Sequence, residues 1–363
     1  MTQAAPQATR SFHKLRVGET RLEIGGSAKT IVFDLPGALC ETFRWRPGQH
    51  LTLRFNLSGE ELRRSYSISS SPFSDDRRLS MRITVKRVEG GRISNHINDN
   101  LKAGDKVEVM PPFGGFCLDP GAMRRRTHYF FGAGSGITPL FAMIQSVLSD
   151  EPHSVVHLVD GNRNAATILF KDELDRLCDA YPGRLSVSHL LSSPSLWSGF
   201  RPWRKGKIDA AAIEAVFAEY PPYAQDVQYY ICGPGDMNRF VRTALTSLDV
   251  PVSRIHMESY GGAVAQDDTI KGMAATARVT LGDSTQSIEV AEGQTLLEAA
   301  RAAGLTPPFS CQSGVCGACR ARLVKGSAEM RARMALEDTE ISKGVVLTCQ
   351  SLATSSELEV VYE

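Results

Sequence analysis

Four cysteines near the C-terminal end of the chain have the spacing of a ligand set for a binuclear iron–sulfur cluster. Of eight cysteines in 363 residues, these four follow the pattern C-x4-C-x2-C-x29-C, typical of plant-type [2Fe–2S] sites: Cys311, Cys316, Cys319 and Cys349. Small residues and two glycines between the first three let the backbone wrap closely around a cluster. A structural zinc site or buried free thiols are the alternatives, but zinc usually takes two short C-x2-4-C pairs. The spacing therefore favours the cluster.

A glycine-rich turn between an apolar strand and a helix could bind a phosphate. The segment Gly132-Ala-Gly134-Ser-Gly136 precedes Thr138 and Pro139, which are predicted to cap the helix and to open its first turn. Free N–H groups at such a helix start favour a pyrophosphate or an adjacent flavin. The spacing is not a strict G-x-G-x-x-G, so a plain strand–helix turn is the alternative.

A second candidate ligand turn is Cys232-Gly233-Pro234-Gly-Asp-Met237, at the end of a later apolar strand. In an open α/β sheet, ligands bind beyond the carboxyl ends of the strands, where this turn is expected to lie. A lone strand-end cysteine is more often a small core residue. The Gly-Pro turn that follows favours a nicotinamide contact.

The segment Asp160-Gly-Asn162-Arg163 follows the strand expected beside the adenosine ribose. Arg163 and Lys171 could hold the 2′-phosphate of NADPH. The negative charge of Asp160 would disfavour binding of that phosphate. Arg163 could equally bind the pyrophosphate or face water. The sequence therefore leaves the choice between NADH and NADPH open.

The elements that must position these residues form three predicted domains. Alternating strands and helices in 121–262 predict a doubly wound parallel sheet, with strands at 127–131, 154–159, 184–191, 227–232 and 254–259, and helices at 139–148, 166–179, 210–219 and 236–248. Short alternating runs in 11–120 predict an antiparallel Greek-key β-barrel, with strands near 30–35, 50–55, 65–70, 80–88 and 106–110. A linker is predicted at 263–275.

Residues 276–363 predict a small β-grasp α+β ferredoxin domain around the four cysteines. A hairpin near 277–292 is followed by a capping box, Thr295-Leu-Leu-Glu298, that opens a helix which Gly304 is placed to end. The alternating residues 357–362 predict a final strand.

The order of several short motifs resembles the ferredoxin–NADP reductase superfamily. These are R-x-Y-S at 64–67, V-K at 85–86, G-G-x-x-S at 90–94, G-x-G-x-G-I-T-P at 132–139, C-G-P at 232–234 and E-x-Y at 258–260. The resemblance covers 11–262, and 276–363 resembles plant-type ferredoxin. The fused order resembles the reductase subunits of multicomponent oxygenases, of the type that serves phenylacetyl-CoA epoxidase or ketosteroid hydroxylase.

This resemblance implies a role for each motif residue. Arg64 would bind a flavin phosphate, Tyr66 would stack on the flavin, and Ser67 would hydrogen-bond flavin N5. The other implied FAD contacts are Ser65, Thr84, Val85, Lys86, Gly91, Arg92, Ile93, Ser94 and Thr138. The group at 91–94 would hold a pyrophosphate, which favours FAD over FMN. The implied NAD(P)H contacts are Gly134, Gly136, Asn162, Arg163, Cys232, Gly233, Pro234 and Met237. Tyr260 would cover the flavin, and Glu258 with Cys232 would fix the nicotinamide.

The implied activity is an NAD(P)H oxidoreductase that passes electrons through FAD and the [2Fe–2S] cluster to a separate terminal oxygenase. The same redox chain could serve a desaturase, a hybrid-cluster protein or another acceptor, and a redox-sensing regulator is a further alternative. A net charge of +1 predicts no nucleic-acid partner, and no apolar run reaches the roughly 18–20 residues of a membrane span. The first residues lack an apolar signal segment, so a cytoplasmic location is expected.

Overall fold

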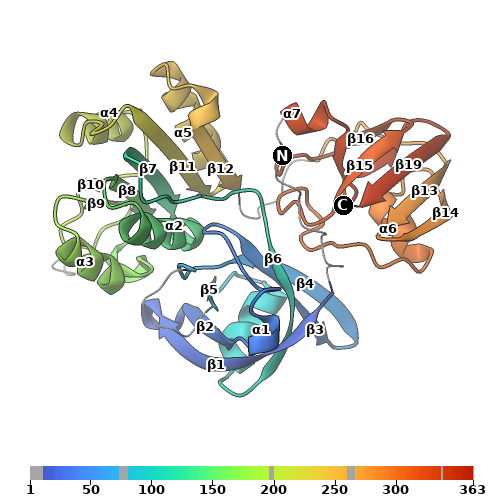
Figure 1. Ribbon diagram of the computed structural model, residues 1–363, viewed down its shortest axis with the longest axis horizontal. Coiled ribbons are helices and arrows are strands. Elements are labelled where there is room, and N and C mark those ends of the chain that lie inside the picture. Colours follow the sequence, from blue (N-terminus) through green and yellow to red (C-terminus); the bar gives the residue numbers. More distant parts are fainter. Residues whose placement is uncertain (1–10, 73–80, 196–199, 260–265, 337, 363) are drawn as a thin grey trace. The chain divides into compact units, whose positions relative to one another are not determined.

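The computed structural model describes residues 11–72, 81–195, 200–259, 266–336 and 338–362. The chain divides into two compact units (Figure 1). The larger unit comprises residues 13–62 and 66–260, and the smaller unit comprises residues 1–12, 63–65 and 261–363. Within the described ranges, no helix is both long and apolar enough to cross a membrane.

The first sheet of the larger unit is the predicted antiparallel barrel. Its six strands have the order β4-β3-β6-β1-β2-β5. An isolated bridge between Ile68, directly after β4, and Ile83 of β5 connects the two edge strands. The strands are β1 His13–Glu23, β2 Ala28–Asp34, β3 His50–Leu57, β4 Glu60–Ser67, β5 Met81–Lys86 and β6 Lys106–Phe113, and helix α1 spans Arg92–Asn100. Strand β1 was not expected, because only Leu15 and Val17 of its eleven residues are buried, and so its apolar alternation is short.

Alternate residues of the barrel strands point inward and form its core. Leu51 and Leu53 of β3, for example, are fully buried with Ile83 of β5. Each such side chain contributes about 1.5–3 kcal/mol of transfer free energy. On the opposite face of β5, Arg82 and Lys86 reach the neighbouring sheet, whereas Thr84 lies against Thr30 of β2.

The second sheet of the larger unit is parallel, as predicted, with the order β10-β9-β8-β7-β11-β12. Its strands are β7 Arg126–Ala133, β8 Val155–Asn162, β9 Leu185–Leu191, β10 Arg204–Lys205, β11 Asp226–Gly233 and β12 Ile255–Ser259. Its helices are α2 Ile137–Asp150, α3 Lys171–Ala180, α4 Ala210–Glu219 and α5 Gly235–Ser247. Separate apolar clusters cover its two faces, which confirms the doubly wound architecture.

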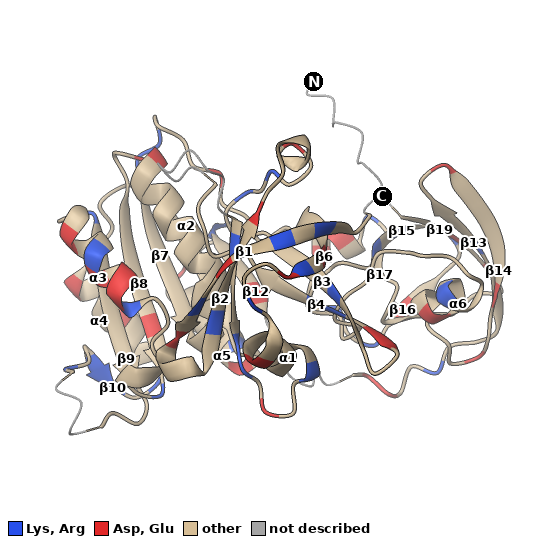
Figure 2. Cartoon of the chain, turned by 90° about the horizontal axis from the view of Figure 1, so that it is seen from below, with Lys and Arg blue, Asp and Glu red and all other residues tan. Residues whose placement is uncertain are grey.

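Three details of this sheet differ from the sequence prediction. Strand β10 was missed because it has only two residues, both basic, seen in blue in Figure 2. Helix α3 begins at Lys171 rather than at 166, because a capped 3-10 turn at Ala165–Thr167 comes first and Phe170 takes a left-handed φ of 59°. Helix α2 begins at Ile137, and the Thr138 hydroxyl donates to Ser135 O at 2.9 Å. Thr138 therefore does not cap the helix, contrary to the prediction.

The smaller unit has the predicted β-grasp form. Its main sheet has the order β14-β13-β19-β15-β17, and β16 pairs with β18. The elements are β13 Ala275–Leu281, β14 Ser284–Val290, α6 Leu296–Ala302, β15 Arg320–Lys325, β16 Ala328–Met330, α7 Asp338–Ile341, β17 Val345–Leu347, β18 Ser351–Ala353 and β19 Glu357–Tyr362. The Thr295–Glu298 capping box is present, and Gly304 follows α6 with a φ of 81°.

The described part of the predicted linker is 266–275, and its last residue, Ala275, already begins β13, whereas 266–274 contains no helix or strand. This stretch bonds to the rest of the smaller unit, because Asp267 N–H donates to Arg331 O at 3.0 Å and Met273 N–H donates to Ala353 O at 2.9 Å. It therefore folds as part of the smaller unit.

Candidate flavin, nicotinamide and iron–sulfur sites

The two predicted ligand turns meet at the centre of the parallel sheet. Strands β7 and β11 are neighbours in the sheet. From β7 the chain continues to β8 on one side, and from β11 it continues to β12 on the other side. A crevice forms at the carboxyl ends of strands where the winding direction reverses in this way. Gly132 pairs with Cys232 across these strands, so both turns lie at this switch point.

Glycine at position 136 is required by the close approach of the two turns. A Cβ on Gly136 would lie 2.0 Å from Cys232 O, whereas one on Gly233 would meet the flexible end of Met237, 2.7 Å from its Cε. Gly134 has a φ of 55°, in the left-handed region. Pro234 then leads directly into α5. The predicted nicotinamide residues therefore form one interlocked backbone structure.

Asn238, which the sequence analysis did not single out, holds the end of β12 against α5. Its Nδ2 donates to Glu258 O at 2.7 Å and to Ser259 Oγ at 2.9 Å, and the side chain is fully buried. Glu258 pairs with Cys232 in the β11–β12 register, and Cys232 is itself buried in the apolar core. Tyr260 lies outside the described residues. The sequence gives no signal for Asn238, because its burial and its partners at the end of β12 become apparent only in the folded unit.

The adenosine-side residues separate into a buried and an exposed group. The Asp160 carboxylate is buried, where it accepts from Asn162 Nδ2 at 2.7 Å and pairs with His189 Nδ1 at 3.1 Å. Lys171 Nζ contacts Asp175 at 2.6 Å, whereas Arg163 is exposed at the end of β8. Asp160 therefore faces partners inside the protein, and Arg163 is the accessible cation of the predicted set.

The predicted flavin residues lie on two barrel strands. Arg64, Ser65, Tyr66 and Ser67 follow one another on β4, and Ser67 at its end is buried. On β5, Thr84 Oγ1 lies 2.8 Å from Thr30 Oγ1, and Val85 points into the barrel core. A Cβ built on Gly134 would lie 3.7 Å from Lys86 Nζ, so the end of β5 reaches the glycine-rich turn of the parallel sheet.

The start of α1 suits an anion because no side chain caps it. Gly91 is the N-cap residue, and a Cβ there would lie 2.3 Å from Ser94 Oγ. Asn98 Nδ2 donates to Val85 O at 3.0 Å, which ties α1 to β5. Arg92 pairs with Glu60 at 2.6 Å on the surface, and Ile93 is buried. The Gly91 N–H donates to Val88 O at 2.9 Å, so the backbone N–H groups that follow it at the start of this nine-residue helix are the expected pyrophosphate donors.

A seam between the barrel and the parallel sheet keeps the flavin and nicotinamide residues together. The Arg82 guanidinium of β5 lies 5.4 Å from the Phe141 ring centre of α2, and burial lowers the pKa of Arg82. Gln145 Nε2 donates to Ser69 O at 3.1 Å, and Ser71 Oγ lies 2.9 Å from Ser146 Oγ. The sequence gives no signal for these contacts, because their partners lie about 60 to 75 residues apart.

The four predicted cluster cysteines form two pairs in the smaller unit. Cys311 interacts with Cys316, and Cys319 interacts with Cys349. Among the described residues, no three His, Cys, Asp or Glu side chains converge as they would for one metal ion. A binuclear cluster needs this two-plus-two arrangement, since each iron takes two thiolates. The donor set therefore fits a [2Fe–2S] cluster better than a zinc ion.

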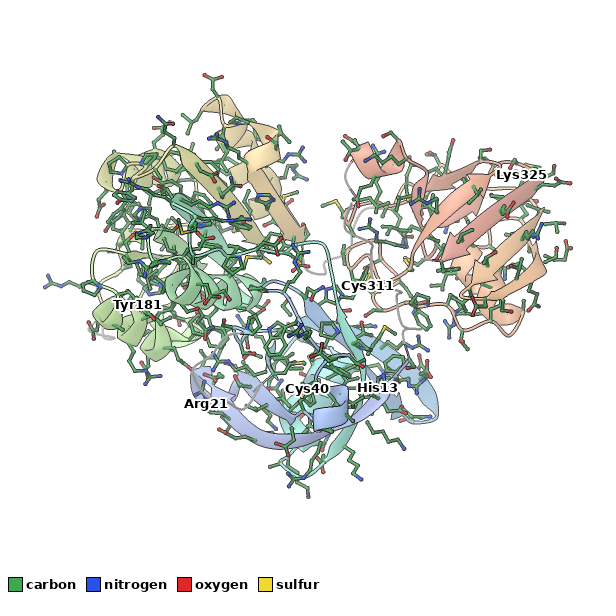
Figure 3. All side chains as sticks on the ribbon, viewed as in Figure 1. His13, Arg21, Cys40, Tyr181, Cys311 and Lys325 are labelled. Carbon is green, nitrogen blue, oxygen red and sulfur yellow. The ribbon has the colours of Figure 1, made fainter. Side chains whose placement is uncertain are left out.

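The loop that carries Cys311, which is labelled in Figure 3, supplies N–H groups to the cysteine sulfurs. Ser313 N donates to Cys311 Sγ at 3.4 Å, and Ala318 N donates to Cys316 Sγ at 3.5 Å. The hydrogen bond with Cys316 and the Ser313 N–H lower the pKa of Cys311, which favours the thiolate that iron binds. A Cβ on Gly314, whose φ is 77°, would lie 2.8 Å from Ala332 O, so this turn requires glycine.

Comparisons with known proteins agree with the three predicted cofactors. Three family models match: an oxidoreductase FAD-binding domain at 16–117, an oxidoreductase NAD-binding domain at 130–243 and a 2Fe-2S iron-sulfur cluster binding domain at 279–354. These matches confirm FAD, a nicotinamide coenzyme and a [2Fe–2S] cluster as the cofactors.

Relatives and a solved structure match along nearly the whole chain. One component of the 1,2-phenylacetyl-CoA epoxidase of Escherichia coli is 34% identical over 97% of this chain and 98% of that protein. The ferredoxin reductase component of 3-ketosteroid-9-alpha-monooxygenase from Rhodococcus rhodochrous is 34% identical over 93% of this chain and 94% of that protein. The structure of phthalate dioxygenase reductase covers 97% of this chain and 98% of that chain, with a TM-score of 0.57 and 25% identity.

Proposed function

Because this chain belongs to the reductase components of multicomponent oxygenases, we propose that it oxidises NAD(P)H and passes the electrons to one separate terminal oxygenase. The observation that supports this most is that the end of β5 reaches the glycine-rich turn, which in turn packs against the Cys232 turn in the larger unit. FAD and the cluster, when bound, convert a two-electron hydride donor into a source of single electrons. The protein's own residues supply binding and orientation.

For the flavin, the proposed contacts follow the barrel strands. Ser67 would donate a hydrogen bond to N5, Tyr66 would stack on the ring system, and Arg64 would bind a phosphate. The main chain at Ser65 and at 84–86 would line the diphosphate, which the N–H groups at 91–94 would bind. The uncapped start of α1 and the steric need for glycine at 91 support the last assignment.

For the nicotinamide, the proposed contacts are the interlocked turns at 134–138 and 232–237. Cys232 and Glu258 would hold the nicotinamide ring beside the flavin, and Asn238 would fix the backbone that carries Glu258. Asn162 would act through Asp160, which it binds, whereas exposed Arg163 would contact the coenzyme phosphates. Geometry of this kind is the main protein contribution to a hydride transfer. Tyr260 is proposed to cover the flavin face until the coenzyme enters.

For the domains, the proposed bounds are 11–120 for FAD, 121–262 for NAD(P)H and 276–363 for the cluster, with 263–275 as the linker. The family-model matches fall inside each of the three bounds. Cys311, Cys316, Cys319 and Cys349 are the proposed iron ligands.

The test is reconstitution of electron transfer with purified proteins. The full-length protein, carrying flavin and iron, is mixed with NADH or NADPH and with an oxygenase component encoded beside its own gene. We expect the oxygenase to accelerate coenzyme consumption and to form a hydroxylated or epoxidised product. Acceleration by a desaturase or a hybrid-cluster protein instead of by the oxygenase would overturn the proposed partner. A purified protein without iron or flavin would overturn the redox chain itself.

A further inference from the structure

One peptide group of the cluster loop is held at both of its ends. Gln312 has a left-handed φ of 56°, unusual for a residue other than glycine, and the peptide that follows it joins Gln312 to Ser313. The N–H of this peptide donates to Cys311 Sγ at 3.4 Å. Its carbonyl oxygen, Gln312 O, accepts from Gln350 Nε2 at 2.9 Å. Gln350 follows the fourth cysteine, so it reaches the loop from 38 residues away in sequence.

A planar peptide transmits orientation from its oxygen to its nitrogen. The C=O and N–H of a trans peptide point in opposite directions within one plane, and deviation from that plane is energetically unfavourable. A side chain that fixes the direction of Gln312 O therefore also fixes the direction of the Ser313 N–H. Gln350 is itself anchored by a second bond, from Nε2 to Cys349 O at 3.0 Å.

Stability alone does not explain an amide at position 350. The Gln350 side chain is 2% exposed, and within the described part of the chain its Oε1 is buried without a hydrogen-bond partner. An unsatisfied buried acceptor is unfavourable, and an apolar side chain of similar volume would avoid this cost. The left-handed φ of Gln312 adds a further unfavourable backbone contribution. The arrangement thus keeps two unfavourable features around one N–H···S bond.

We propose that Gln350 is a positioning residue that raises the reduction potential of the [2Fe–2S] cluster by aiming the Ser313 N–H at the Cys311 sulfur. A hydrogen bond to a ligand sulfur stabilises the more negative, reduced cluster, and hydrogen bonds of this kind are among the terms that set iron–sulfur potentials. The inference requires the cluster but not the proposed oxygenase partner. It is therefore tested separately from the proposed function.

The chain offers a matched control at Thr348. Its Oγ1 donates to Cys319 O at 3.0 Å, so it also holds a carbonyl of the cluster loop. The N–H of that peptide belongs to Arg320 and donates to Gly317 O at 3.1 Å, not to a sulfur. Thr348→Val and Gln350→Met thus each remove one side-chain donor beside the cluster. Only the glutamine acts on a peptide whose N–H meets a ligand sulfur.

The experiment is a redox titration of the full-length holoprotein, followed by the EPR signal of the reduced cluster. Gln350→Met is expected to fold normally and to lower the reduced-to-oxidised ratio at a fixed potential by about three- to tenfold. A tenfold change corresponds to a shift of about 59 mV for a one-electron couple. Thr348→Val is expected to lower the midpoint of thermal unfolding while leaving the cluster potential close to that of the native protein.

Two results would overturn the proposal: an unchanged potential in Gln350→Met, or equal shifts in Gln350→Met and Thr348→Val. Gln350→Asn provides a second test if the methionine variant assembles poorly. Its amide keeps the donor but is one methylene too short to reach Gln312 O from the same backbone position. It should shift the potential in the same direction as Gln350→Met, and a native potential in this variant would count against the proposal.

Discussion

The two units build their sites in opposite ways. In the larger unit, the site combines strand ends from two sheets, and residues as far apart as Lys86, Gly136 and Cys232 must meet. In the smaller unit, three of four ligands lie on one nine-residue loop, and the fourth comes from the segment before β18. A site assembled from distant elements depends on the packing of a whole unit, whereas a loop site depends on a few local bonds. Disturbances should therefore spread in the larger unit and stay local in the smaller one.

The largest effect should follow from Cys316→Ser, which tests whether the loop site is separable. Loss of one thiolate ligand should abolish cluster assembly, and cytochrome c reduction should fall at least a hundredfold. Hydride transfer to the flavin should remain, since the nicotinamide turns and most of the flavin residues lie in the other unit. The check is NAD(P)H oxidation with dichlorophenolindophenol, a two-electron acceptor, beside the cytochrome assay. If both activities disappear in a folded variant that still holds FAD, the two sites are not separable.

The next largest effect should follow from Gly136→Ala in the larger unit. The new Cβ would lie 2.0 Å from Cys232 O, so the two turns must move apart. A displacement of about 1 Å at a reacting centre can reduce the rate about a hundredfold, and we expect kcat/KM for NAD(P)H to fall by that order. Rapid mixing, followed at the flavin absorbance, measures this step directly.

Gly37→Ala is the matched control for that substitution. A Cβ on Gly37 would meet nothing within 4 Å, and its φ is not in the left-handed region. Flavin reduction in this variant should stay within about twofold of the native rate, in line with surface changes of about 0.5 kcal/mol or less. A comparable loss in both variants would mean that the close approach at Gly136 is unimportant.

The sequence predicted the helices and strands that have a strong local signal. Helix α4 begins and ends where predicted, because the Asp209 side chain caps it by accepting from Ala212 N at 2.8 Å. Strand β10 and the start of α3 were missed, since a two-residue charged strand has no periodicity and the residue immediately before α3, Phe170, has a rare left-handed φ. Local patterning carries no information on where such exceptions fall.

The candidate sites divide along the same line. The cluster cysteines follow from their spacing, because a loop site is local in sequence. The roles of Asn238, Arg82 and Gln350 depend on partners 20, 59 and 38 residues away, and no motif marks them. Thr138 was predicted as a helix cap, but α2 begins two residues earlier than predicted, and the Thr138 hydroxyl donates to Ser135 O. Contacts between distant segments were thus the part that the sequence could not supply.

Acid should destabilise the larger unit more than the smaller one, because all eight histidines precede residue 261 and none follows it. Burial lowers the pKa of His157 to about 4, so the folded larger unit favours the neutral ring. The unfolded chain takes up a proton near pH 6.5, and the stabilising contribution is therefore lost as pH falls from about 6.5 toward 4. Burial lowers the pKa of His128 as well. Thermal midpoints followed by flavin fluorescence should fall over this range.

The smaller unit, followed by visible circular dichroism of the cluster, should change less between pH 6.5 and 5. His157→Phe should reduce the pH slope of the larger unit, and exposed His153 offers His153→Gln as the control with an unchanged slope. Equal slopes for the two units, or an unaltered slope in His157→Phe, would contradict the assignment of acid sensitivity to buried histidines.

The smallest effect compares one helix cap in each unit. Thr295→Ala and Asp209→Ala each remove an N-cap acceptor and should each destabilise their unit by about 1 kcal/mol. The consequences should differ, because α6 is bonded to the segment before the fourth cysteine, with Leu297 N–H donating to Thr348 O at 3.0 Å. Opening of that segment should expose the cluster about fivefold more often in Thr295→Ala, measured as the rate of iron loss to a chelator. Asp209→Ala should leave this rate unchanged, since α4 lies in the other unit.

Equal rates of iron loss in the two variants would mean that the loop site depends on more of the chain than its local bonds.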